Sequence, residues 1–140
     1  MEYRKFGSDY VLRIDRGEEV MASLTAFCRE TGVRLASVAG LGAADRVVLG
    51  LYDVEEQKFL KQELAGPMEI TSLVGSITEK EGEPYLHLHI TVCGPDLAVK
   101  GGHLNECSIS ATCELNIHCV EGQVGRRYDP VTGLNLFDFT

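Results

Sequence analysis

Only one stretch of this sequence has the spacing of an amphipathic helix, which limits the fold to architectures built mainly from strands. Between Glu18 and Thr31, apolar side chains recur at the three- and four-residue intervals that place them on one face of a helix. Glu18 and Glu19 are expected in its first turn, where the helix dipole favours negative charge. Gly32 follows as the expected C-terminal cap, because glycine adopts a left-handed backbone without strain.

The remaining apolar segments are short, and several alternate with polar residues. Breaks that contain glycine, proline or charged residues separate them, as is typical of strands joined by tight connections. The predicted strands are 10–14, 35–39, 46–53, 58–64, 69–78, 86–93, 108–120 and 135–139. One helix among so many strands predicts an α+β (α/β) fold, in which the helix covers one face of a mainly antiparallel sheet.

The composition is that of one ordinary domain. The 140 residues contain no linker or low-complexity segment, so we expect a single domain over residues 1–140. No apolar run approaches the roughly 20 residues of a membrane-spanning helix, and no export signal is present at the N-terminus. We therefore expect a cytoplasmic protein without membrane contact. The five cysteines include no Cys-x-x-Cys pair, which predicts reduced, mostly buried thiols.

The charge balance disfavours nucleic acid as a partner. Lys and Arg together number 13 against 21 Asp and Glu, giving a net charge of -8. A DNA-binding surface gains much of its affinity by neutralising phosphates. The basic residues here are scattered, and none forms a run longer than two. DNA binding would therefore need a local basic patch that overcomes the field of the whole chain.

Strand 86–93, Leu-His-Leu-His-Ile-Thr-Val-Cys, is the most informative segment for function. Side chains alternate along a strand, so His87 and His89 share the face opposite the core. Their backbones stand about 7 Å apart, and their rings can converge on one ion. His103, in the Gly-Gly-His-Leu segment 101–104, follows after enough chain to turn back toward them. Three neutral imidazoles leave coordination positions open, which is the pattern of catalytic zinc sites.

Simpler explanations remain open at this point. His-x-His arises by chance on solvent-facing strands, and His118 lies on a face of strand 108–120 that looks simply polar. Cys93 shares the face of His87 and His89, but Gly94 ends the strand beside it. The other cysteines of the later strands are expected to pack as small buried hydrophobes. Spacing alone does not decide between a metal site and a polar surface.

Four segments of the chain form a recognisable set. In order they are 38–43 (Val-Ala-Gly-Leu-Gly-Ala), 66–75 (Gly-Pro-Met-Glu-Ile-Thr-Ser-Leu-Val-Gly), 86–89 (Leu-His-Leu-His) and 101–104 (Gly-Gly-His-Leu). Together they resemble the PPC (plants and prokaryotes conserved) domain in its stand-alone prokaryotic form. The resemblance covers nearly the whole chain. Its most specific part is His-x-His followed by Gly-Gly-His-Leu.

The resemblance implies a strongly curved, mainly antiparallel sheet with one main helix, assembled as a homotrimer. The fold of the family is similar to that of acetolactate decarboxylase, a zinc enzyme with three histidine ligands. By this analogy the resemblance implies a divalent metal ion, most simply zinc, at His87, His89 and His103. Fold similarity alone does not establish function.

The family is also associated with DNA, because plant members attach the domain to AT-hook motifs. This chain has no Arg-Gly-Arg-Pro hook. The plant motif Gly-Arg-Phe-Glu-Ile appears here as Gly66–Ile70, with Pro67 and Met68 in place of Arg and Phe. Partner recognition of the plant type is therefore in doubt.

Three functions compete on this basis. The first is a metal site that binds or acts on a small molecule, with Glu69 as a nearby general acid or base. In that function Arg126 and Arg127 would bind an anion, although adjacent arginines on a loop are more often solvated. Glu69 also has a simpler explanation, as a strand carboxylate that is paired with arginine or faces water.

The second function is a DNA-binding regulatory protein, and the third is a non-catalytic trimeric scaffold. The apolar segment 131–139 would contribute to a trimer interface, or equally to an ordinary core strand. Asp96 and Glu106 are weaker candidates for an acid or base near the Gly-Gly-His segment. Three imidazoles also suit Ni, Co, Cu and Fe, so the residues do not identify the ion.

Overall fold

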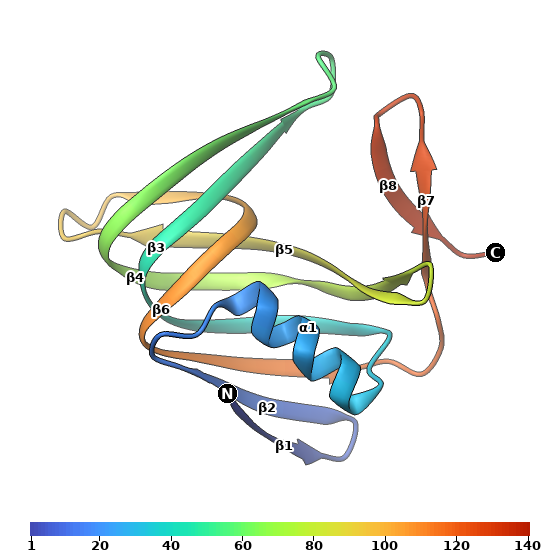
Figure 1. Cartoon of the computed structure of the whole chain (residues 1–140), viewed down its shortest axis with the longest axis horizontal. Coiled ribbons are helices and arrows are strands. Elements are labelled where there is room, and N and C mark those ends of the chain that lie inside the picture. Colours follow the sequence, from blue (N-terminus) through green and yellow to red (C-terminus); the bar gives the residue numbers. More distant parts are fainter.

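The computed structural model describes all 140 residues, which form one helix and eight strands (Figure 1). In chain order these are β1 (Glu2–Phe6), β2 (Asp9–Asp15), α1 (Val20–Thr31), β3 (Ala36–Asp53), β4 (Lys58–Lys80), β5 (Glu83–Cys93), β6 (Val99–Cys119), β7 (Gly125–Asp129) and β8 (Leu134–Asp138). Strands β1 and β7 have no counterpart among the predicted strands. Both are short and rich in charged residues, so no apolar alternation marks them.

Six strands form one sheet in the order β1-β2-β6-β3-β4-β5, and every pairing is antiparallel. The long strand β6 also pairs with β5, which closes the β6-β3-β4-β5 part of the sheet on itself. The sheet is strongly curved, and α1 packs across one of its faces (Figure 1). The prediction of an α+β fold with a curved, mainly antiparallel sheet and one helix is confirmed.

Several glycine-containing segments that we predicted as breaks lie inside continuous strands. Predicted strands merge in pairs, 35–39 with 46–53 into β3 and 58–64 with 69–78 into β4. Gly101 and Gly102, which lie between the predicted strands 86–93 and 108–120, are also within a strand, β6. Register shifts show bulges in the pairing of β3 with β4, and a bulge bends a strand without ending it. Gly40 is needed because a Cβ atom there would overlap the backbone of β6.

Helix α1 begins later than the sequence indicates. Glu19 is its N-cap, and its carboxylate accepts hydrogen bonds from two amides of the first turn. Glu18 lies before the helix, 2.6 Å from the amino group of Met1. The prediction that both glutamates lie in the first turn is therefore wrong, because Glu19 caps the helix and Glu18 forms an ion pair before it. Gly32 ends the helix with φ 72°, as predicted. The helix is not long and apolar enough to cross a membrane.

The core lies between α1 and the sheet. A single cluster of 25 buried residues fills it, including Leu24 and Phe27 of the helix. The ring of Phe27 packs edge-on against Tyr10 of β2, with 5.0 Å between centroids. All five cysteines are free thiols, and all but Cys119 are buried. Burial raises the pKa of Cys107 to about 12, which makes this thiol inert at neutral pH.

Two hairpins extend from the body of the molecule in the same direction (Figure 1). One is the far end of β3 and β4, and the other is formed by β7 and β8. Their tips are in contact, because the amide of Gln57 donates hydrogen bonds to the carbonyl oxygens of Pro130 and Val131. The last strand, β8, is therefore not a core strand, and Val131 and Phe139 beside it are each 79% exposed.

Candidate metal centre

Three of the four histidines lie on adjacent strands of the closed part of the sheet. His87 and His89 project from β5 on the face opposite to Leu88 and Ile90, which are buried in the core. The pairing of β5 with β6 sets His103 directly opposite His89. The closure of the sheet therefore brings a distant histidine next to the His-x-His pair.

The three imidazole rings converge. One ring nitrogen from each histidine lies within 4.8 Å of the other two. The ring centroids are 5.3 Å apart for His87 and His89, 5.3 Å for His87 and His103, and 5.6 Å for His89 and His103. We refer to these three residues as the histidine cluster. His87 and His89 are exposed and His103 is partly buried, so the cluster is open to solvent.

Two glycines allow β6 to approach closely enough for this convergence. A Cβ atom on Gly101 would lie 2.7 Å from the side chain of Thr91 and 2.9 Å from the carbonyl oxygen of Ile90. A Cβ atom on Gly102 would lie 2.6 Å from the carbonyl oxygen of Gly50 on β3. Because side chains at these positions would collide with backbone on both sides, glycine is required for β6 to fit between β5 and β3.

The surroundings of the cluster favour neutral imidazoles. Burial lowers the pKa of His103 to about 4, and the neighbouring His87 acts in the same direction. Burial is also the main reason why the pKa of His87 is lowered, with smaller contributions from His89 and Arg126. A neutral imidazole has a free lone pair, which is the form that coordinates metal ions. The ring of Phe59 packs edge-on against His103, with 5.3 Å between centroids.

The donor set fits a divalent metal ion. Zinc takes imidazole nitrogens at about 2.1 Å, which places two nitrogens of a tetrahedral site about 3.4 Å apart. The nitrogens of the histidine cluster already lie within 4.8 Å of one another. Three such ligands leave a fourth position toward the open side.

The predicted acid or base is not part of the cluster. Glu69 is exposed on β4, where it pairs with Cys93. Cys93 is four residues from His89 along β5, about 13 Å by strand geometry. Cys93 itself is buried. The structure of one chain therefore does not bring either residue to the histidine cluster.

The weaker candidates have structural partners of their own. The carboxylate of Asp96 accepts a hydrogen bond from the amide of Ala98 within a turn. Glu106 forms an ion pair with Arg46 at 2.6 Å. His118 lies near the other end of β6, where its Nδ1 atom is 2.6 Å from a carboxylate oxygen of Asp9. None of these three residues belongs to the histidine cluster.

The two adjacent arginines lie in different surroundings. Arg127 is exposed, whereas Arg126 is partly buried and hydrogen-bonds to Ser76 and Thr78 of β4. Ser76 pairs directly with His87, so Arg126 belongs to the same region as the cluster. No pattern in the sequence singles out Ser76 or Phe59. Alternation within 69–78 could have placed Ser76 on a solvent-facing side, but its pairing with His87 depends on a register that the sequence does not show.

The fold and the cluster together define a class of protein: a closed antiparallel sheet, covered by one helix, that carries three convergent histidines on its outer face. Residues 1–120 match the family model for the Plants and Prokaryotes Conserved (PCC) domain. The chain belongs to this family, as the resemblance of its four segments indicates. The β7–β8 hairpin lies beyond the matched residues. No curated protein sequence matches the chain.

Solved structures of the same fold cover almost the whole chain. A candidate DNA-binding protein from Bacteroides thetaiotaomicron is 32% identical, with a TM-score of 0.96 over 99% of this chain and 96% of that chain. A protein from Archaeoglobus fulgidus, described as metal-containing, is 34% identical, with a TM-score of 0.88 over 97% and 96%. A plant- and prokaryote-conserved protein from Pyrococcus horikoshii is 26% identical, with a TM-score of 0.87 over 99% and 96%.

Proposed function

We propose that the histidine cluster of His87, His89 and His103 holds a divalent metal ion, most simply zinc, in a site that binds or acts on a small molecule. The observation that carries this proposal is the convergence of three ring nitrogens within 4.8 Å on an open face of the sheet. The metal-containing neighbour from Archaeoglobus fulgidus supports it.

A divalent ion in such a site supplies a Lewis acid that can polarise an oxygen atom of a small molecule. The chain's own contribution is to hold three imidazoles in place. The pairing of His89 with His103 and the packing of Phe59 on His103 restrict the rings. Glu69 lies away from the cluster within one chain, so we assign it no step in a reaction.

The test is elemental analysis of the purified protein, compared between His87→Ala and His118→Ala. His118 is a matched control because it is an exposed strand histidine outside the cluster. We expect about one equivalent of metal in the wild type and in His118→Ala, and at least about tenfold less metal in His87→Ala. Equal metal content in both variants would contradict the proposal.

A turnover assay distinguishes whether the protein is an enzyme or a non-catalytic binding module. Metal-loaded protein would be tested on carbonyl, ester and keto-acid compounds, with His87→Ala as the comparison. Turnover that disappears in this variant supports an enzyme. Binding of such compounds without turnover supports a non-catalytic module.

DNA binding is the second candidate, because the neighbour from Bacteroides thetaiotaomicron is described as a candidate DNA-binding protein. The surface of this chain argues against it. Several arginines are already paired with carboxylates at 4 Å or less, namely Arg13, Arg29, Arg34 and Arg46. A paired arginine has less net charge to offer a phosphate, and the whole chain carries -8. A gel shift that persists at physiological salt would reverse this ranking.

A further inference from the structure

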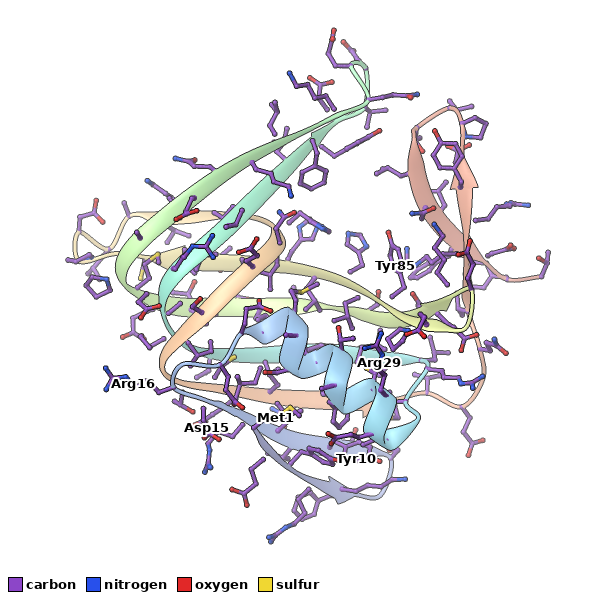
Figure 2. The ribbon with its side chains drawn as sticks, viewed as in Figure 1. Met1, Tyr10, Asp15, Arg16, Arg29 and Tyr85 are labelled. Atoms are coloured by element: carbon purple, nitrogen blue, oxygen red, sulfur yellow. The ribbon has the colours of Figure 1, made fainter.

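Arg126 lies in unusual surroundings on β7, outside the residues that match the family model. Its guanidinium carbon is 4.6 Å from the ring centroid of Tyr85 and 4.3 Å from that of Phe137. Tyr85 lies near the base of the β7–β8 hairpin (Figure 2). These aromatic contacts restrict the orientation of the guanidinium. Further partners can therefore contact it through the N–H groups along its edge.

Hydrogen bonds fix this guanidinium without neutralising it. Nε donates to the hydroxyl of Thr78 at 2.9 Å, Nη1 to the carbonyl oxygen of Asn135 at 3.2 Å, and Nη2 to the hydroxyl of Ser76 at 3.4 Å. All three acceptors are uncharged. Three of the five N–H groups are used, so each Nη atom keeps one N–H free.

No carboxylate lies within ion-pair distance of Arg126, although the chain has 21 acidic residues. The guanidinium is nevertheless partly buried, and burial lowers its pKa. A desolvated cation without a counter-charge is unfavourable unless an anion joins it. The guanidinium of Arg126 is therefore a positive charge that no carboxylate of the chain neutralises.

This charge lies beside the histidine cluster. Nη2 of Arg126 reaches Ser76, and Ser76 pairs with His87 on the same face, where paired side chains are about 5 Å apart. The charged groups that act on His87 and His103, apart from the histidines themselves, are Arg126 and Lys61. Both are cations. In a chain of net charge -8, the surroundings of the cluster are thus locally positive.

We propose that Arg126 binds the carboxylate of a small molecule whose other end lies at the histidine cluster. This inference rests on the proposed function and adds the substrate class, a small carboxylic acid. The planar fork of a guanidinium matches the two oxygens of a carboxylate. The unpaired guanidinium of Arg126 carries one positive charge. This matches the single negative charge of a carboxylate better than the double negative charge of a phosphate.

The test is a titration of the full-length ¹⁵N-labelled protein with lactate, lactamide and inorganic phosphate, both metal-free and zinc-loaded. Lactamide has nearly the same shape as lactate without its charge. We expect lactate to shift the NMR signal of the Arg126 Nε–H group in both forms. In the zinc-loaded protein we expect lactate to bind at least about tenfold more tightly than lactamide. Phosphate is expected to bind more weakly than lactate.

Arg126→Gln and Arg127→Gln form the matched pair of variants. Arg127 is adjacent in sequence but exposed. We expect Arg126→Gln to reduce the preference for lactate to less than about twofold, and Arg127→Gln to retain it. Arg126→Lys, which keeps the charge but not the fork, should fall between them. Backbone spectra of the β7–β8 hairpin show whether each variant keeps its fold.

The outcomes separate this inference from the metal proposal. A lactate preference that survives in Arg126→Gln, or that Arg127→Gln loses equally, would overturn the role of Arg126. Tighter binding of phosphate would overturn the carboxylate class. Zinc uptake by the same samples tests the histidine cluster independently, and the metal-free titration decides the role of Arg126 even if no zinc binds.

Discussion

At the scale of single residues, the closure of the sheet depends on two positions without side chains. Gly101 and Gly102 lie where β6 fits between β5 and β3, and a Cβ atom on Gly102 would collide with the carbonyl oxygen of Gly50. The same strand carries His103, the next residue. The geometry of the histidine cluster and the stability of the sheet therefore depend on the same close approach.

Gly102→Ala should affect both properties. We expect a loss of about 1–3 kcal/mol in the free energy of unfolding, because the backbone of β6 or of β3 at Gly50 must move to accommodate the Cβ atom. We also expect weaker zinc binding, because His103 would shift. Urea denaturation and elemental analysis measure these effects. Gly94→Ala is the control, since a Cβ atom there meets only one side-chain atom at 3.7 Å. Equal effects in both variants would contradict this role for Gly102.

Buried thiols predict a dependence of stability on alkaline pH. The pKa values of Cys28, Cys107 and Cys113 are raised to about 12, mainly by burial, from an ordinary value of 9.0. Above pH 9 the unfolded chain loses thiol protons that the folded chain keeps. The stabilising contribution is therefore complete below pH 9 and is lost as pH rises toward 12.

We expect the free energy of unfolding to fall between pH 8 and pH 10 by about 1 kcal/mol for each buried thiol. Cys107→Ala should be less stable at pH 8, yet show a smaller fall between the two pH values. Urea denaturation at both pH values, with reducing agent present, measures the difference. An identical fall in the wild type and in the variant would contradict the assignment.

At the scale of elements, Glu19 connects α1 to the sheet. Its carboxylate caps the helix and also accepts a hydrogen bond from the amide of Cys107 on β6 at 3.0 Å. Loss of the cap costs about 1 kcal/mol, and an unpaired buried amide costs a further 1–3 kcal/mol. We therefore expect Glu19→Ala to destabilise the protein by about 2–4 kcal/mol in thermal or urea unfolding.

Glu18→Ala is the comparison for this prediction. Glu18 lies before the helix, makes a partly buried ion pair with the amino group of Met1, and accepts a hydrogen bond from the amide of Asp15. The loss of these two contacts should cost about 1 kcal/mol, which is less than the expected cost of Glu19→Ala. Glu19→Ala with wild-type stability would show that the cap and the contact to β6 are unimportant.

The sequence predicted the elements that local patterns specify. The helix follows from its apolar spacing, and Gly32 follows from glycine's left-handed backbone. The merging of strands into β3 and β4 was missed because glycine and proline mark turns and bulges alike. Only the neighbouring strand shows that a Cβ atom at Gly40 would overlap β6.

In the candidate site, the positions that depend on alternation follow from the sequence, and those that depend on register do not. His87 and His89 share a face by strand geometry alone. The distance of Glu69 from the cluster follows from its pairing with Cys93, and the proximity of Arg126 follows from the docking of the β7–β8 hairpin. Both are contacts between distant segments, and no local pattern in the sequence encodes them.

At the scale of the whole molecule, we propose assembly as a homotrimer, as the family resemblance implies. Large apolar side chains are exposed on the projecting hairpins and nearby, including Leu51, Leu60, Val131 and Phe139. An assembly that covers these side chains would remove their apolar surface from water.

Light scattering after size exclusion tests the assembly. We expect a mass of three chains over a wide range of protein concentration. Phe139→Ser should shift the mass toward one chain at low concentration if the C-terminal segment lies in the interface. A monomeric mass for the wild type at every concentration would contradict the homotrimer.

The most direct test of the central claim is a crystal structure of the purified protein with anomalous diffraction on both sides of the zinc absorption edge. We expect one strong anomalous peak, bounded by ring nitrogens of His87, His89 and His103. Crystals grown after zinc addition that show no peak there, or show rings turned away from one another, would contradict a metal centre.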